Sequence, residues 1–286
     1  MRSGWAAGRE WMTRLTEFHG LRVYGLDCTL HSPQPLALRG YYGGVLRGVL
    51  GHALFRGNCV YPAPRCAECA LRGGCPYPQV FKPHLLPGQA DRLPPYLLHR
   101  WQPLPQGVRF SLLLLNPALG FAENWLRQMD RFLPELEIGG QPGVRVQEVR
   151  DLASGEPAFR AGRFLPSARL NPLQPALPAS DRLTVHWLTP LVSKHQHADP
   201  LLGALRTRLQ RLVNAYGDGQ PLVPPETVPW RRVNARLRPQ SITQGLDSRR
   251  RITGLCGELE LAELTPLGAR WLAAGSLLHA GGEATL

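Results

Sequence analysis

Residues 36–54, LALRGYYGGVLRGVLGHAL, combine a cluster of glycines with an apolar pattern of helical period. Four apolar residues recur at i, i+3, i+4 and i+8, namely Leu46, Val49, Leu50 and Leu54. This spacing places them together on the side of a helix that faces the core. Arg47, Gly51 and His52 then fall on or near the opposite, accessible side. The stretch therefore predicts a helix that packs one face and presents the other.

The glycines of this stretch allow two interpretations, and both stay open at the level of sequence. Gly43 and Gly44 stand near the expected start of the helix, where uncovered backbone N–H groups and the helix dipole favour a phosphate. Alternatively, the glycines, which include Gly48 and Gly51, permit another element to pack closely against the helix.

The charge of the chain points to a polyanionic partner. Its formal net charge is +12 over 286 residues, which is unusual for an enzyme of small anionic metabolites and typical of proteins that meet nucleic acid or a membrane surface. Lys82 and Lys194 are the only lysines among 33 basic residues. Arginine binds phosphate with two hydrogen bonds and stacks on bases, so this composition suits RNA, although a GC-rich genome produces the same preference.

The sequence gives no sign of membrane insertion or secretion. No apolar run approaches the roughly 18 residues that span a bilayer. Charged residues interrupt any apolar signal region near the start of the chain, namely Arg2, Arg9, Glu10 and Arg14. We therefore expect a cytoplasmic protein without membrane contact, reduced thiols, and a flexible extension over residues 1–17.

The first half of the chain predicts one α+β domain. Alternating apolar residues predict strands over 21–30, with a bulge near Gly25, and over 144–152, and a strongly apolar run predicts a strand over 108–115. A helix over 120–133 presents one apolar face, formed by Phe121, Trp125, Met129 and Phe132. Residues 76–105 have no clear period and are expected to form a covering loop or an edge segment. This order is that of a ferredoxin-like βαββαβ domain, here over 18–178.

The second half repeats the pattern and defines a second domain over 179–286. A strand is expected over 183–191, and a helix starts at the Asp199 N-cap and Pro200 and ends at Gly217. Its arginines, Arg206, Arg208 and Arg211, are placed on the outer side. A strand over 254–261 and a helix over 266–278 follow. The predicted fold class is α+β, with two tandem ferredoxin-like domains.

A cysteine-rich insertion interrupts the first domain over residues 57–80. Its spacing, C-x6-C-x2-C-x5-C, suits four ligands of a structural zinc ion, which are Cys59, Cys66, Cys69 and Cys75. A full shell of four thiolates leaves no open position, so such a metal is not catalytic. An iron–sulfur cluster uses the same number of ligands, and free or redox-active cysteines are the other alternative. Cys28 and Cys256 fall in predicted strands and are expected in the core.

A strongly basic segment leads into the strand over 254–261. Its seven arginines are Arg231, Arg232, Arg236, Arg238, Arg249, Arg250 and Arg251. A run of like charge is often a solvated tail, but these arginines are attached to a predicted sheet, from which they could bind a phosphate backbone. The chain then ends in the glycine-containing sequence HAGGEATL, residues 279–286.

Taken in order, these segments resemble a known family. Their order resembles that of the CRISPR-associated repeat-processing endoribonucleases, and the motifs that carry the resemblance are LRGVLGHAL, CPYPQVF, LQRLVNAYG, RRRITGLCGELEL and LLHAGGEATL. These enzymes belong to a superfamily of repeat-associated RNA-binding proteins with tandem ferredoxin-like folds. The resemblance extends from about Leu21 to Leu286, and the arginine excess resembles the corresponding subunit of type IV systems. It departs from the family where the terminal glycine loop would continue into a last strand.

The resemblance implies a chemistry for this chain. Such enzymes cut CRISPR repeat RNA without a catalytic metal, with the 2′-hydroxyl beside the scissile phosphate as nucleophile. By this resemblance, His52 would act as acid or base and Arg39 and Arg47 would hold the phosphate. The seven arginines of the basic segment would bind the stem of the repeat RNA, and the loop around Gly281 and Gly282 would contact the RNA backbone.

The resemblance leaves two alternatives for the function of the protein and its partners. The protein would retain its product RNA and join other CRISPR effector subunits, or it would be a non-catalytic RNA-binding subunit of such a complex. A zinc-dependent DNA-binding protein is disfavoured, because no recognition helix follows the cysteines.

Overall fold

The chain folds into two compact units of helices and antiparallel sheets. One spans 22–173, and the second comprises residues from Gln174 onward together with Phe18, Gly20 and Leu21. This is the predicted α+β class. The computed structural model describes residues 18, 20–38, 43–62, 65–165, 170–175, 177–191, 199–218, 220–223, 225–244 and 250–279. None of the helices in that part of the chain is long and apolar enough to cross a membrane.

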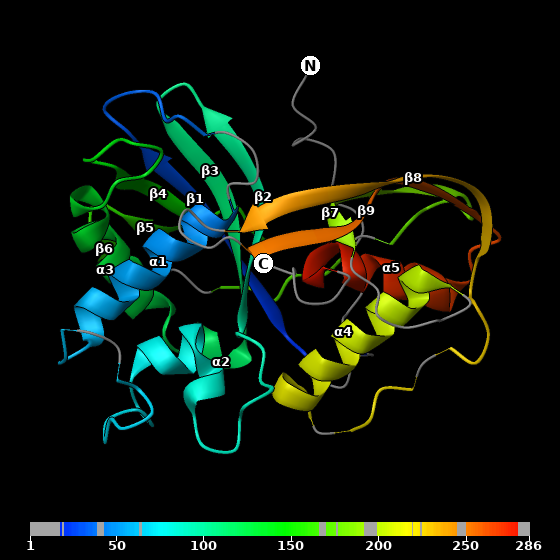
Figure 1. Cartoon of the computed structure of the whole chain (residues 1–286), viewed down its shortest axis with the longest axis horizontal. Helices are drawn as coiled ribbons and strands as arrows, with labels where there is room; N and C mark the ends of the chain where they lie inside the picture. Colours follow the sequence, from blue (N-terminus) through cyan, green and yellow to red (C-terminus); the bar gives the residue numbers. More distant parts are fainter. Residues whose placement is uncertain are drawn as a thin grey trace. The chain divides into compact units, whose positions relative to one another are not determined.

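The first unit is built on six strands (Figure 1). These strands are β1 (Val23–His31), β2 (Tyr96–Leu104), β3 (Gly107–Leu115), β4 (Arg145–Asp151), β5 (Pro157–Arg160) and β6 (Arg163–Phe164). Its helices and helical turns are α1 (Gly43–Asn58), η2 (Tyr77–Phe81), η3 (Pro83–Leu85), α2 (Asn116–Leu119), α3 (Ala122–Phe132) and η4 (Leu133–Glu135).

The strands of the first unit pair in the order β2-β3-β1-β4-β5-β6, with every pair antiparallel. The predicted strands over 21–30, 108–115 and 144–152 are confirmed as β1, β3 and β4. Within 76–105, β2 forms one edge of the sheet. The sequence analysis missed β5 and β6, because short strands among prolines and glycines leave no alternation to recognise.

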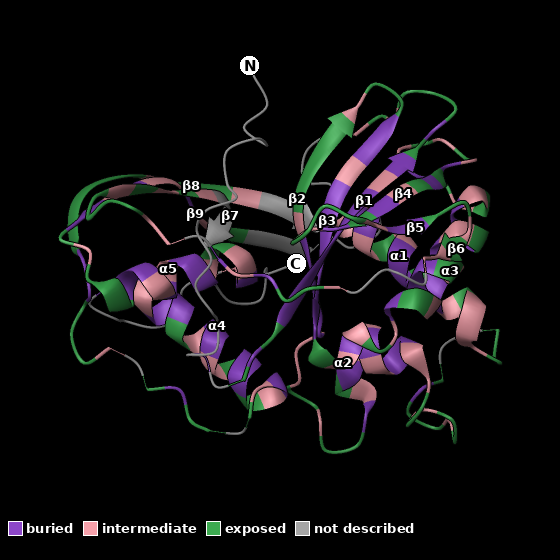
Figure 2. Cartoon of the chain, turned by 180° about the vertical axis from the view of Figure 1, so that it is seen from behind, coloured by how far each residue is buried: buried purple, intermediate pink, exposed green. Residues whose placement is uncertain are grey.

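The core of the first unit lies between the sheet and the helices α1 and α3. Figure 2 shows the buried residues concentrated on β1 and β3 and on one side of these helices. The predicted apolar face of α3 is confirmed: Trp125 and Met129 are fully buried. The Trp125 Nε1–H donates a hydrogen bond to the Leu50 carbonyl at 3.2 Å, which fastens α3 to α1.

The predicted bulge at Gly25 is wrong. Gly25 pairs in register with Leu113, and the irregularity of β1 falls between Thr29 and Leu30. A Cβ at Gly25 would lie 2.8 Å from Leu152 and 2.9 Å from Leu173. The glycine is needed because two leucines pack directly on the backbone.

The second unit contains β7 (Leu183–Leu191), α4 (Pro200–Tyr216), β8 (Arg231–Gln244), β9 (Arg250–Ala262) and α5 (Pro266–Leu278). Its three-stranded sheet has the order β7-β9-β8. Both β7 and β8 are antiparallel to β9, so they are parallel to each other. In the first unit, β1 and β2 flank β3 in the same way.

Helix α4 begins and ends where the sequence predicts. The Asp199 carboxylate accepts hydrogen bonds from the backbone N–H groups of Leu201 and Leu202 at 2.9 and 3.0 Å. At the other end, the Gly217 N–H donates to the Val213 carbonyl at 2.8 Å. The predicted apolar stripe is confirmed as buried, with Leu201, Leu205, Leu209, Leu212 and Tyr216.

The placement of Arg208 on the outer side of α4 is wrong. Arg206 and Arg211 are exposed, but Arg208 is only 5% exposed because it follows Leu201 by seven residues and shares its side of the helix. Its Nε–H donates to the Leu278 carbonyl at 3.1 Å, at the end of α5. Burial lowers the pKa of Arg208 to about 10, with a smaller effect from Arg211.

Candidate functional site

Helix α1 carries two of the three predicted catalytic residues, Arg47 and His52. Leu46, Leu50 and Leu54 are buried as predicted. The expectation that Gly51 is accessible is wrong: a Cβ there would lie 2.1 Å from the Phe81 ring. Gly51 therefore serves close packing, whereas Gly48 has nothing within 4 Å of a Cβ.

The candidate catalytic residues are not gathered at one point in the described part of the chain. His52 is exposed, and its ring lies 6.3 Å from that of Phe55. Arg47 is half-buried, with its guanidinium 5.4 Å from the centre of the Phe81 ring. Five residues of helix separate the two side chains by about 140° around the axis. Arg39 lies outside the described residues.

Arg47 sits beside a row of aromatic side chains that the sequence analysis did not recognise. We call this row the aromatic ladder, and it consists of Phe55, Tyr77, Phe81, Tyr96 and Trp125. Successive ring centres are 5.0–5.8 Å apart. The rings come from α1, η2, β2 and α3, so the sequence signal was limited to an aromatic-rich stretch without period.

Two tyrosines of the ladder, Tyr77 and Tyr96, interact electrostatically with Arg47. Burial, with smaller effects from Cys66 and Cys59, raises the pKa of Tyr77 to about 12, while Arg47 acts in the opposite direction. Burial also raises the pKa of Tyr96, again against an opposing effect of Arg47. Both phenols are neutral at physiological pH, so the positive charge of Arg47 is not cancelled by them.

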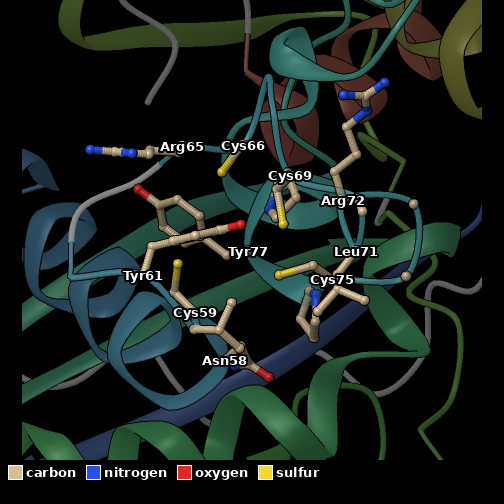
Figure 3. Close-up of a pocket in the computed structure, with 16 residues that line it drawn as sticks. Asn58, Cys59, Tyr61, Arg65, Cys66, Cys69, Leu71, Arg72, Cys75 and Tyr77 are labelled. Carbon is tan, nitrogen blue, oxygen red and sulfur yellow. The ribbon is translucent and has the colours of Figure 1, made fainter.

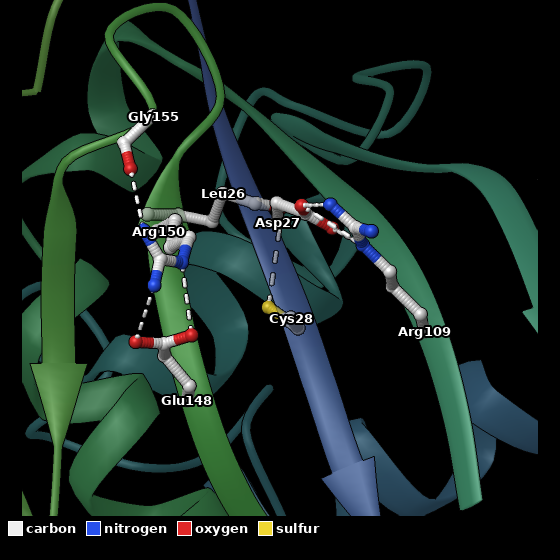
Figure 4. Close-up of polar contacts among 7 residues, drawn as sticks. All are labelled: Leu26, Asp27, Cys28, Arg109, Glu148, Arg150 and Gly155. Carbon is white, nitrogen blue, oxygen red and sulfur yellow. Dashed lines mark hydrogen bonds and ion pairs between the residues drawn. The ribbon is translucent and has the colours of Figure 1, made fainter. Parts of the chain in front are cut away.

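The polar side of the first sheet holds a second group of residues that the sequence did not single out. Asp27 is 6% exposed and accepts hydrogen bonds from the Arg109 Nε–H at 2.9 and 3.0 Å, with further contact to Nη2 (Figure 4). This bidentate pair raises the pKa of Arg109. Arg150 forms a similar pair with Glu148 at 2.8 and 3.0 Å. These arginines already have carboxylate partners, so they are poor candidates for binding phosphate.

His99 belongs to the same region. It pairs in register with Ser111, which pairs with Asp27 on the next strand. Burial, with a smaller effect from Arg100, lowers the pKa of His99 to about 4. The imidazole is therefore neutral at physiological pH.

In the second unit, four predicted RNA-binding arginines lie on the edge strand β8, and we call them the β8 arginines: Arg231, Arg232, Arg236 and Arg238. All four are exposed. Arg231 pairs with Glu263 at 2.7 Å. Among the described side chains, no ion pair is found for Arg232, Arg236 or Arg238. These three cations are available to an anionic partner.

The face that carries Arg236 and Arg238 is polar. Arg236 stands opposite Glu258 and Asn234 opposite Glu260 in the register of β8 and β9. Glu258 also contacts His186 at 3.4 Å. Arg250 and Arg251 lie on β9, but their side chains are outside the described part of the chain, as are Arg249, Gly281 and Gly282 altogether.

The four cysteines predicted as metal ligands line one cavity of about 500 Å³ (Figure 3). In the figure, the sulfurs of Cys59, Cys66, Cys69 and Cys75 point toward the space between them. Burial raises the pKa of the Cys66 thiol, the other three cysteines raise it further, and Lys82 lowers it. Within the described residues, no three His, Cys, Asp or Glu side chains are arranged closely enough to hold a metal ion.

Comparison with known proteins gives one family match. A family model described as the AF_1859_N N-terminal domain matches residues 21–168, just over half of the chain. No curated protein matches the sequence.

Several solved structures are similar to this chain along most of its length. Thermus thermophilus Cas6 has 18% identity and a TM-score of 0.46, over 92% of this chain and 94% of that one. A Cas6 product complex has 18% identity and a TM-score of 0.48, over 91% and 95%. A structure described as a RAMP protein binding different RNA substrates has 13% identity and a TM-score of 0.43, over 92% and 95%.

Proposed function

The chain belongs to the AF_1859_N N-terminal domain family, and from this premise we propose that it binds CRISPR repeat RNA and cleaves it as an endoribonuclease. The order of its sequence motifs suggests this substrate. The observation that carries RNA binding is the set of exposed arginines on β8 that have no carboxylate partner among the described side chains.

The fold of the second unit supports this proposal. Its strand order and its alternation of strands and helices repeat those of β1 to α3 in the first unit, which is the pattern of two tandem ferredoxin-like domains. In this arrangement, residues 59–75, which contain the four cysteines, are part of an insertion between α1 and β2. Edge strand β8 offers arginines along its length, and arginine suits a phosphate backbone because it donates two parallel hydrogen bonds.

The proposed reaction needs no catalytic metal. The 2′-hydroxyl loses its proton to a base and attacks the adjacent phosphorus, and the 5′-oxygen leaves with a proton from an acid, which yields a 2′,3′-cyclic phosphate and a 5′-hydroxyl. His52 is the proposed acid or base, because an imidazole can both accept and donate a proton. Arg39 and Arg47 are the proposed cations that stabilise the charge on the phosphate. The protein would then retain its product and join other effector subunits.

One observation favours a second candidate, a repeat-binding subunit that does not cleave. His52 and Arg47 point to different sides of α1, about 140° apart, so together they do not form a compact catalytic group. Binding through the β8 arginines does not require these two residues.

A cleavage assay tests the enzyme proposal. The purified chain is incubated in EDTA with repeat RNA transcribed from the CRISPR arrays of its own genome. We expect cleavage that disappears when the nucleotide before the cut is 2′-deoxy. His52→Ala should reduce the rate by about 10²–10⁴-fold, whereas Arg127→Ala, an exposed arginine on α3 paired with Glu123, should not. Cleavage that tolerates the 2′-deoxy substitution would refute the mechanism, and tight binding without cleavage would favour the second candidate.

A binding assay tests the β8 arginines separately. We expect Arg236→Ala or Arg238→Ala to weaken binding of the same repeat RNA, measured by fluorescence anisotropy, and to lower the slope of log K against log salt by about 1. Glu258→Gln should strengthen binding, because it removes the carboxylate opposite Arg236. Equal salt slopes for Arg236→Ala, Arg238→Ala and the Arg127→Ala control would show that β8 is not the RNA-binding strand.

A further inference from the structure

The cysteine loop, residues 59–75, has few of the interactions that usually hold a loop of this length. Its large apolar side chains point to solvent: Val60 is 69% exposed and Leu71 is 62% exposed. The hydrogen bonds found for residues 65–75 run to residues within 65–79, as turns and short side-chain contacts. Core burial holds only part of this loop: Cys66 is 7% exposed within the hydrophobic core, and Cys75 packs against that core. The hydrogen bonds described above do not connect residues 65–75 to the sheet.

The loop nevertheless brings four thiols to one cavity. Two consecutive turns shape this part of the loop: the Cys69 N–H donates to the Cys66 carbonyl at 3.4 Å, and the Arg72 N–H donates to the Cys69 carbonyl at 3.2 Å. As a result, the Cys66 and Cys69 sulfurs point toward the same space (Figure 3). Cys59 and Cys75 enter it from the two ends of the loop. Four thiolates around one space suit a tetrahedral thiophilic cation.

We propose that this cavity is a structural zinc site, whose four ligands are Cys59, Cys66, Cys69 and Cys75. Zinc is bound by thiolate at about 2.3 Å, a closer arrangement than the four sulfurs adopt around the cavity. Binding therefore draws the loop inward. Gly73 and Gly74 have nothing within 4 Å of a Cβ, so this part of the loop has room to move.

The zinc ion would connect two elements that carry the aromatic ladder. Cys59 directly follows α1, and its N–H donates to the Phe55 carbonyl at 2.8 Å. Cys75 lies just before η2, which contributes Tyr77 and Phe81. Because Phe81 packs against Gly51 and lies under Arg47, the ion would hold η2 in place against α1. Four thiolate ligands leave zinc no open position, so its role is structural.

Metal analysis of the purified chain tests the site. The protein is produced without a histidine tag, dialysed against metal-free buffer and analysed by inductively coupled plasma mass spectrometry together with acid-labile sulfide. We expect about one zinc ion per chain and no iron. Iron with inorganic sulfide would overturn the zinc assignment in favour of a cluster, and a chain without stoichiometric metal would overturn the site.

Variants identify the ligands. Cys69→Ser and Cys75→Ser should each lower the zinc content at least several-fold, whereas Cys256→Ser, a buried cysteine of the second unit, should retain it. If a loop variant does not fold, the wild-type chain gives the same information: a thiol-modifying reagent should release zinc to a colorimetric chelator as loop cysteines are modified, as identified by mass spectrometry. Zinc retained after modification of all four cysteines would overturn the assignment.

A third measurement reports the structural role. With the metal removed by chelation, residues 59–81 should become several-fold more sensitive to limited proteolysis, and added zinc should restore protection, whereas magnesium should not. Unchanged proteolysis would refute the role assigned to the ion. The site is independent of the RNA proposal, since a chain that binds zinc but does not bind repeat RNA would retain the former and lose the latter.

Discussion

The two units share the order strand, helix, strand, strand, helix, but they place their chemistry in different parts of that order. The first unit has a long connection, residues 59–95, between α1 and β2, and this connection carries the four cysteines and part of the aromatic ladder. The second unit connects α4 to β8 through residues 217–230 and carries its charged residues on the strands β8 and β9 themselves.

The comparison shows that the shared order of helices and strands determines how the strands pair in each sheet. The connections and the edge strands are where the two units differ in their chemistry. In the first unit, strands β4, β5 and β6 extend the sheet beyond β1. In the second unit, the described strands are β7, β9 and β8, and both edges of that sheet are open within the described residues. Exposed edges and loops are where binding groups accumulate on a rigid scaffold.

The largest expected effects test whether each unit has its own core. Trp125→Ala in the first unit and Trp271→Ala in the second remove side chains that are at most 1% exposed. Each should lower the free energy of unfolding by about 3–5 kcal/mol. Hydrogen exchange should show lost protection mainly in the mutated unit. Equal loss in both units for both variants would mean that they unfold as one.

A smaller effect is expected at the start of α4. Asp199→Ala removes the cap of two backbone N–H groups and the acceptor of the Trp230 Nε1–H, 3.0 Å away. We expect a loss of about 2–3 kcal/mol in urea unfolding, because a helix cap and a buried donor are both lost. Thr265→Ala is the matched variant on α5, where one N–H is capped at 3.1 Å, and should cost about 1 kcal/mol. Equal losses would show that the Trp230 contact contributes nothing.

A pH-dependent effect should appear in the first unit. The pKa of His99 is lowered from 6.5 to about 4 by burial and Arg100. Between these values the unfolded chain binds a proton that the folded unit does not, so stability falls as the pH drops. We expect His99 to account for a loss of about 2 kcal/mol at pH 5 relative to pH 7.

Urea unfolding at the two pH values, with and without His99→Gln, measures this contribution. The variant should lose less stability between pH 7 and pH 5 than the wild type. His186→Gln, an exposed histidine on β7 of the second unit, is the control for removing one imidazole. Parallel curves for the wild type and His99→Gln would contradict the assignment.

A last comparison distinguishes two glycines of α1, and one of them has the smallest expected effect. Gly51→Ala should destabilise the first unit by about 1–3 kcal/mol, because its Cβ would overlap the Phe81 ring. Gly48→Ala should stabilise it by about 0.4–1 kcal/mol, because the new methyl group meets nothing within 4 Å and an alanine loses less entropy in a helix. Thermal unfolding of both variants measures the difference. A stabilising Gly51→Ala would mean that η2 does not pack closely on α1.

The sequence predicted most of the helices and strands, because each carries its own periodic pattern. The N-cap Asp199, the end of α4 at Gly217 and the bounds of α5 follow from local chemistry. By contrast, Arg208 was misplaced because seven helical residues return a side chain to nearly the same face, and only the packing of α5 shows that this face is covered. The candidate site follows the same division: the four cysteines were found from their spacing, whereas the aromatic ladder was missed because its rings come from four elements.

Although β8 was interpreted only as a basic segment, the sequence by itself determined the α+β class, the grouping of the cysteines and the concentration of arginine before the last strand. These properties depend on residues that are close in the chain. Only the tertiary structure decided that Gly51 is covered by Phe81, that Arg47 lies over an aromatic ring while His52 faces solvent, and that Asp27 neutralises Arg109 but no described carboxylate pairs with Arg236. The physical reason is that burial and charge pairing depend on distances between segments far apart in the chain, which local periodicity does not encode.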